Sequence, residues 1–114
     1  MLWKVSFILK CFLFFFTKPL IFLAAFHLDL SSFASVKKFA QRVIYTTDEV
    51  HVLINNAETM MIEETITEDG NEKQMQSNHI GHFLLTKLLM PTLKKAESSR
   101  IINVTSIAHA WGKF

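Results

Sequence analysis

The chain has 114 residues, half of them hydrophobic, and it carries a formal net charge of +2 at neutral pH. The excess positive charge lies entirely before His27, because the rest of the chain has nine Lys or Arg residues against ten Asp or Glu residues. The length therefore allows one small domain, the balanced charge argues against a nucleic-acid-binding face, and the single cysteine, Cys11, excludes an intrachain disulfide.

Residues 1–27 form a strongly apolar segment that we expect to lie outside the main domain, which would cover residues 28–114. Seven of the eleven phenylalanines lie in this segment. It is long enough to span a bilayer as a helix, but Lys10 and Lys18 are costly at depth and Pro19 breaks or kinks a helix. Three interpretations stay open: a membrane anchor, a signal peptide, and non-coding or alternative-exon sequence joined near His27.

The next elements are predicted from local patterns. Residues 28–30 are typical of the end of a strand, and Ser31 or Ser32 can cap a following helix. Apolar side chains then recur at helical spacing from Phe33 to Ile44. A turn leads into an apolar, β-branched run at residues 50–54, which reads as a buried strand.

The second half repeats this alternation. Residues 58–70 form an acidic, irregular connection, and a helix is predicted from about residue 71 to residue 89 or beyond, with Pro91 near its end. A second apolar strand is predicted at residues 100–104, followed by a loop. Strand, helix, strand, helix and strand at this spacing indicate a parallel α/β sheet.

Polar residues follow the two apolar strands directly. Asn55 and Asn56 end the first strand, and Thr105 and Ser106 end the second. In open α/β sheets the ligand crevice lies outside the carboxyl ends of the strands, so these side chains are candidates for function. Asn78 lies inside the second predicted helix, where asparagine is mildly unfavourable and therefore needs a reason.

Together these motifs resemble the short-chain dehydrogenase/reductase family, in its retinol dehydrogenase-like branch. The resemblance extends from Leu28 to Phe114 and rests most strongly on the run from Asn78 to Thr86, which reads Asn-His-Ile-Gly-His-Phe-Leu-Leu-Thr. It implies an α/β fold with a Rossmann-like, doubly wound parallel sheet. The sheet would be incomplete, because its first strands and its C-terminal part are missing, so that the strands at 50–54 and 101–104 become direct neighbours.

The resemblance also implies site residues. Asp29 and Leu30 match the segment that contacts the cofactor's adenine, and Asn55, Asn56 and Ala57 match the segment that lines the cofactor, with Asn56 helping to stabilise the central strand. Asn78 matches an asparagine that orders a water in a proton relay. Ser106 matches the serine that hydrogen-bonds the substrate carbonyl.

The sequence departs from the family pattern in three places. Glu58 stands where the family has glycine, which adds bulk and negative charge near an anionic cofactor. The chain has no glycine-rich turn before residue 28, which weighs against cofactor binding by this chain alone. The tyrosine and lysine pair that transfers the proton has no match, because Tyr45 lies in the wrong segment.

Two functions from different classes follow. In the first, the chain is a fragment of an oxidoreductase that transfers hydride between NADP(H), with NAD(H) as the alternative, and a retinoid or other lipophilic alcohol or aldehyde. In the second, it is an inactive fragment, tethered to a membrane through residues 1–27, with a binding role or none. Retinol dehydrogenase-like proteins imply a membrane location such as the endoplasmic reticulum, with the cytoplasm as the alternative. No metal site is expected. His79 and His82 are part of the motif that resembles the family, and we interpret them as packing residues.

Overall fold

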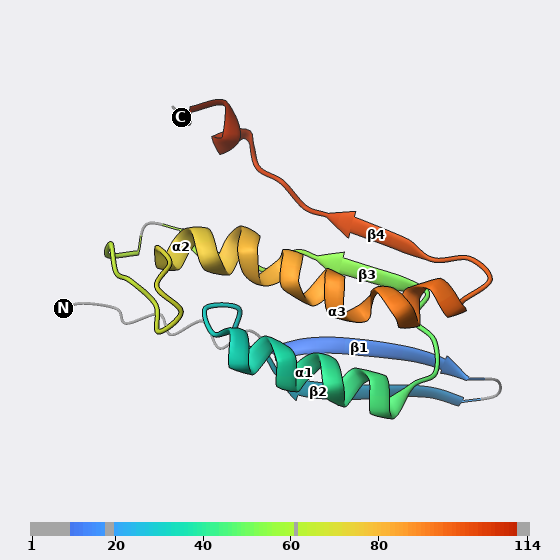
Figure 1. Ribbon diagram of the computed structural model, residues 1–114. Coiled ribbons are helices and arrows are strands. Elements are labelled where there is room, and N and C mark those ends of the chain that lie inside the picture. The colour runs from blue at the N-terminus through green and yellow to red at the C-terminus, as the bar shows by residue number, and fades with distance from the viewer. Residues whose placement is uncertain (1–9, 18–19, 61, 112–114) are drawn as a thin grey trace.

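The computed structural model describes residues 10–17, 20–60 and 62–111 (Figure 1). From β2 onward, strands and helices alternate along the chain, which confirms the predicted α/β class. The elements are β1 (Lys10–Thr17), β2 (Leu20–His27), α1 (Phe33–Thr46), β3 (Val52–Asn55), α2 (Lys73–Met75), the π-helix η1 (Gln76–Ile80), α3 (Gly81–Lys95), β4 (Arg100–Asn103) and the 3-10 helix η2 (Ile107–Trp111).

The described strands form two separate two-stranded sheets. Strands β3 and β4 are parallel direct neighbours, as predicted, with Val52 opposite Arg100 and Asn55 opposite Asn103. Strands β1 and β2 form an antiparallel hairpin in which Lys10 lies opposite His27. Within the described residues, β3 pairs with β4 alone, so the parallel sheet is the partial one expected from the sequence.

The apolar N-terminal segment is extended where the structure describes it. Residues 10–17 and 20–27 form β1 and β2, while residues 1–9 and 18–19 of the predicted segment lie outside the described residues. In the described part of the chain, we find no helix with both the length and the apolar character needed to cross a bilayer. The anchor, signal and artefact interpretations stay predictions.

Strand β2 ends at His27, one residue before the predicted strand end at 28–30. The reason is a local turn, because the Asp29 carboxylate accepts hydrogen bonds from the Ser31 backbone N–H at 2.9 Å and from its hydroxyl at 2.6 Å. Leu28 and Leu30, on either side of Asp29, are both buried. The turn therefore directs the chain into α1 while keeping these two leucines in the core.

Helix α1 begins as the sequence predicts. Ser32 is the N-cap, and its hydroxyl oxygen accepts a hydrogen bond from the Ser35 N–H. The Asp69 carboxylate accepts from the Phe33 N–H at 2.8 Å, which adds a negative charge at the positive end of the helix. The buried stripe of α1 comprises Val36, Phe39, Ala40 and Val43.

The core lies between α1, α3 and β3. Helices α1 and α3 pack side by side, and α3 also packs against β3 (Figure 1). Leu89 and Leu93 of α3 and Val36 and Val43 of α1 are almost completely buried. The core thereby holds the carboxyl end of β3 against the N-terminal half of α3.

The second predicted helix is continuous but irregular. It runs through α2, η1 and α3, and it passes Pro91 and ends at Lys95. The π-helical segment η1, which contains Asn78, was not predicted, because one wide turn leaves almost no trace in side-chain periodicity. Segments of this kind are frequent at functional sites.

Candidate cofactor and catalytic site

A buried asparagine joins the ends of the two parallel strands to α3. The side-chain amide of Asn55 donates to the Asn103 side-chain oxygen at 2.8 Å and to the Thr86 hydroxyl at 3.0 Å. Both of its N–H donors are thus used, and the residue is only 6% exposed. The oxygen of the same amide is buried with no hydrogen-bond partner in the described structure. Asn55 therefore fixes the strand ends, and the stabilising role that the family resemblance implies for Asn56 stays a prediction.

The segment after β3 is held by a histidine of α3. The carbonyl oxygen of Ala57 lies 2.8 Å from Nε2 of His82, which is 9% exposed. Because a carbonyl oxygen only accepts, Nε2 carries the hydrogen and donates it. Asn56, between the two anchored residues, is exposed. The expected cofactor segment is therefore fixed on both sides and open to solvent in its middle.

Asn78 is tied to the segment that follows β3. Its side-chain oxygen accepts from the Thr59 N–H, and its amide nitrogen donates to the Thr59 carbonyl oxygen, both at 2.8 Å. This paired contact explains an asparagine inside a helix, because the side chain completes the backbone hydrogen bonds of another segment. The side chain is nevertheless exposed, so Asn78 lies at the surface beside Thr59.

A fully buried glutamine supports the π-helical segment, and sequence reasoning missed it. The Gln76 side-chain oxygen accepts from the Thr67 hydroxyl at 2.6 Å and from the Asn71 amide at 2.9 Å. Its amide nitrogen donates to the Asp69 carboxylate at 2.6 Å. Because Asp69 also caps α1, this network joins the first turns of both long helices. Its neighbours at helical spacing, Glu72, Lys73 and His79, are polar, so the sequence pattern does not indicate that Gln76 is buried.

The predicted adenine-contacting segment packs against the start of α3. The Asp29 N–H donates to the Ser35 hydroxyl at 2.9 Å, and the Asp29 side chain is exposed. The backbone of Leu30 comes so close to Gly81 that a methyl group there would lie 2.5 Å from the Leu30 carbonyl oxygen. This packing brings Leu30 to the end of α3 that adjoins Asn78.

Ser106 lies beyond the end of β4, in the segment between β4 and η2. Its carbonyl oxygen accepts from the His109 N–H at 3.2 Å and lies 2.6 Å from the His109 ring nitrogen Nδ1. In Figure 1 the chain after β4 leads away from β3 and α3 toward the C-terminus. The structure thus holds Asn55, Ala57 and Asn78 in one region through their hydrogen bonds to Thr86, His82 and Thr59.

Two carboxylates and two histidines lie in or next to the segments that form the site. Glu58, which follows the anchored Ala57, is exposed. Backbone N–H groups of Gln74 and Met75 donate to the Glu72 carboxylate and hold its pKa below the ordinary value of 4.5. His79 is exposed, whereas His82 packs in the interior. Among the described residues, no group of three or more His, Cys, Asp or Glu side chains is placed to hold a metal ion.

The donor set after β3 fits a nicotinamide cofactor in part. Carboxamides and backbone groups at a strand end can donate to and accept from ribose and nicotinamide, and the segment is fixed before any ligand arrives. The exposed Glu58 carboxylate is the group that does not fit, since it would repel the phosphates of such a cofactor.

Comparison with known proteins gives a consistent family. The sequence model described as short chain dehydrogenase matches residues 21–113. Human retinol dehydrogenase 13 is 50% identical over 86 residues, which cover 75% of this chain and 26% of that protein. The chain therefore spans about a quarter of the length of the curated relatives it matches.

Solved structures with the same fold carry related names. The Pseudomonas aeruginosa RhlG/NADP active-site complex matches with a TM-score of 0.58 and 33% identity, covering 71% of this chain and 34% of that one. NADPH-bound carbonyl reductase from chicken fatty liver matches with a TM-score of 0.57 and 28% identity, covering 72% and 37% of the two chains. Sequence and structure agree, and the chain belongs to the short-chain dehydrogenase family.

Proposed function

We propose that this segment supplies the nicotinamide-facing wall of an oxidoreductase that reduces a lipophilic aldehyde or oxidises the corresponding alcohol. The observation that carries the proposal is the fixed segment after β3, in which Asn55 is bonded to β4 and α3 while Ala57 is held by His82. Such a wall is complete before a ligand binds. Binding energy then goes into orienting the cofactor instead of ordering the loop.

The finer assignments rest on similarity. NADP(H) is favoured as cofactor because two neighbouring structures are named as complexes with NADP or NADPH. A retinoid is favoured as substrate because the matching human and mouse relatives are named retinol dehydrogenases. When bound, the cofactor would supply or accept a hydride at the carbonyl carbon.

The residues of this chain would have separate tasks. Asp29 and Leu30 would contact the adenine, and Asn56 and Ala57 would line the nicotinamide ribose. Ser106 would donate its hydroxyl hydrogen to the carbonyl oxygen, where negative charge develops during hydride addition. Asn78 would hold a water in the path that returns the proton, using the helix segment that its bonds to Thr59 keep in place.

The test starts from the full-length transcript that contains the Asn55-Asn56-Ala57 codons. The protein it encodes is assayed for NADPH-dependent reduction of retinal, with NADH as the comparison. Replacing Ser106 by alanine should lower kcat by about a hundredfold or more, as for other groups that stabilise developing oxyanions. Activity that survives Ser106→Ala unchanged, or no reduction of any lipophilic aldehyde, would contradict the proposal.

The 114-residue chain itself is the second arm of the test. The inactive, binding-only alternative expects no turnover from this chain, and the partial sheet with its exposed apolar residues favours that alternative for the chain in isolation. Retinal reduction above a heat-denatured control would exclude it.

A further inference from the structure

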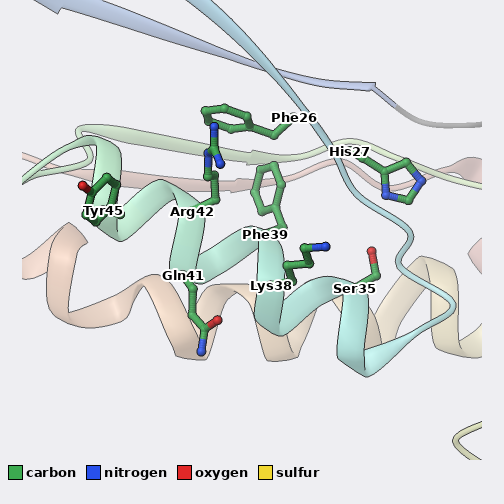
Figure 2. Close-up of a pocket in the computed structure, with 8 residues that line it drawn as sticks. All are labelled: Phe26, His27, Ser35, Lys38, Phe39, Gln41, Arg42 and Tyr45. Atoms are coloured by element: carbon green, nitrogen blue, oxygen red, sulfur yellow. The ribbon is translucent and has the colours of Figure 1, made fainter.

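A pocket of about 640 Å³ lies between β2 and α1, and none of the residues that line it is a candidate cofactor or catalytic residue (Figure 2). Its walls come from the C-terminal end of β2 and from one flank of α1. We call it the α1 pocket. The lining residues on which the argument rests are Phe26, Lys38, Phe39, Arg42 and Tyr45.

The apolar part of the α1 pocket is built on the core. Phe39 is buried in α1, and its ring meets the ring of Phe26 edge to face, with centroids 6.4 Å apart and an interplanar angle of 71°. Because Phe39 is fixed by core packing, the position of the Phe26 ring is fixed with it. The pocket therefore has an aromatic wall anchored on the core, and exposed side chains of α1 and β2 complete its rim.

The polar part of the α1 pocket is cationic. The Arg42 guanidinium lies over the Phe26 ring, 5.2 Å from its centroid, and Lys38 lies one helical turn earlier on the same flank. Neither side chain forms an ion pair with a carboxylate of the described residues, where the one ion pair joins His51 and Glu49. A stacked guanidinium keeps its N–H donors free at its edges, which suits two-point bonding to a carboxylate.

We propose that the α1 pocket binds an amphipathic carboxylate, such as a medium-chain fatty acid. The carboxylate would pair with Arg42 and Lys38, and the alkyl chain would lie on the rings of Phe26 and Phe39. The volume falls within the range of small-molecule sites, which are mostly apolar with a few placed polar groups. This site does not rest on the proposed oxidoreductase function.

Two further observations favour a ligand with one negative charge and a long apolar chain over a ligand with several phosphates. The cations that line the pocket are few, and the free N–H groups at the start of α1 are not available to phosphate oxygens. Ser32 and Asp69 already accept from them, through the N–H groups of Ser35 and Phe33. A nucleotide would therefore leave most of its charge unpaired.

The test titrates the intact 114-residue chain with decanoate and follows the backbone amide signals of Phe26, Ser35 and Gln41 by NMR. These signals should shift saturably. The Arg42→Gln variant should bind about tenfold more weakly or worse, because charge-assisted hydrogen bonds are lost. Lys38→Gln should weaken binding in the same direction.

Lys37→Gln is the matched control, because Lys37 is the neighbouring exposed cation of α1 and does not line the pocket. Its affinity for decanoate should equal that of the parent chain. Decanol, which has the same chain and no charge, should bind more weakly than decanoate to the parent chain. The comparison of decanoate with decanol needs no variant. It therefore tests whether the pocket recognises a carboxylate even if Arg42→Gln does not fold.

Four results would overturn the proposal: no saturable shift with decanoate, equal binding of decanol, equal weakening by Lys37→Gln and Arg42→Gln, or a response to anionic phosphatidylglycerol vesicles without a response to monomeric decanoate. The last result would show that the basic flank of α1 meets a membrane surface and that the pocket holds no single lipid molecule.

Discussion

Gly81 is the residue whose size the fold constrains most directly. It has helical backbone angles, with φ at −62°, so conformational freedom is not the reason for glycine here. The reason is space, because a methyl group would lie 2.5 Å from the Leu30 carbonyl oxygen. Any larger residue would push α3 away from the segment that the family resemblance places against adenine.

Replacing Gly81 by alanine should lower the free energy of unfolding. Alanine gains about 1 kcal/mol of helix propensity, but overpacking against backbone costs about 1–3 kcal/mol, and the clash should win. Urea unfolding followed by circular dichroism measures the balance. Lys87→Ala, on the exposed side of the same helix, is the control and should change stability by no more than about 0.5 kcal/mol. A Gly81→Ala variant more stable than the parent would show that α3 can move.

Glu58 is the residue that we expect to lower the affinity for a nicotinamide cofactor. Its exposed carboxylate follows the anchored Ala57 directly. In the full-length protein, Glu58→Gly should raise the affinity for NADPH, because it removes a negative charge near the cofactor phosphates. The gain should shrink as salt is added, since exposed charges are screened. Fluorescence titration with NADPH tests this, and an unchanged affinity would remove Glu58 from the site.

Glu72 should make stability depend on pH in the acidic range. Its carboxylate accepts from the N–H groups of Gln74 and Met75, which holds its pKa below 4.5 in the folded chain. The stabilising contribution is therefore fully present above 4.5 and is lost as the pH falls through the lowered pKa. Urea unfolding should show Glu72→Gln less stable than the parent at neutral pH, with the difference shrinking in acid. A difference that is constant with pH would contradict this account.

At the scale of the elements, the side chain of Asn55 on β3 links this strand to both β4 and α3. Asn55 donates to Asn103 on β4 and to Thr86 on α3. Asn55→Ala should destabilise the chain by about 1–3 kcal/mol, because it removes two hydrogen bonds made by a buried side chain, each contributing about 0.5–1.5 kcal/mol. The adjacent exposed Asn56 supplies the control, since Asn56→Ala removes a carboxamide from the same turn without touching this network. Equal losses for the two variants in urea unfolding would mean that the network contributes nothing.

How well each element could be predicted depends on how local its signals are. Helix α1 follows from Ser32 as cap and from a regular apolar stripe, and both signals lie inside the helix itself. In the π-helical η1, Gln76 is buried by hydrogen bonds to three polar residues of the preceding loop, and side-chain periodicity does not reveal hydrogen bonds of this kind. Only the end of β2 could be predicted, near residues 28–30, and β1 could not, because a continuous apolar run does not distinguish a strand from a helix.

At the scale of the molecule, the parallel pairing and the line-up of strand ends could be predicted, because alternation of elements fixes them. Which side chains hold the site together could not. His82 was expected to pack, but its bond to Ala57 joins residues 25 positions apart, and that partner is visible only once the chain is folded. Asn55 and Asn56 are likewise identical in sequence, and only burial separates the one that fixes β4 from the one that faces solvent.

The described molecule also leaves one face of the parallel sheet open, and this should govern its behaviour in solution. Leu53 is buried toward α3, whereas Val52 and Ile54 alternate with it and are 49% and 57% exposed. Their β4 neighbours Arg100 and Ile102 lie in register on the same side. Apolar residues gathered on one open sheet face favour aggregation. The 114-residue chain should therefore aggregate as its concentration rises.

Ile54→Lys should reduce that aggregation without unfolding the chain, because a lysine there projects from the open face and replaces apolar surface with charge. Light scattering over a concentration series measures the effect, with circular dichroism to check the fold. Ile66→Lys is the matched control, since Ile66 is 68% exposed but lies outside both sheets. If any exposed isoleucine promoted aggregation regardless of its position, Ile66→Lys would reduce aggregation at least as well as Ile54→Lys. If the open sheet face is the cause, only the change at Ile54 should matter.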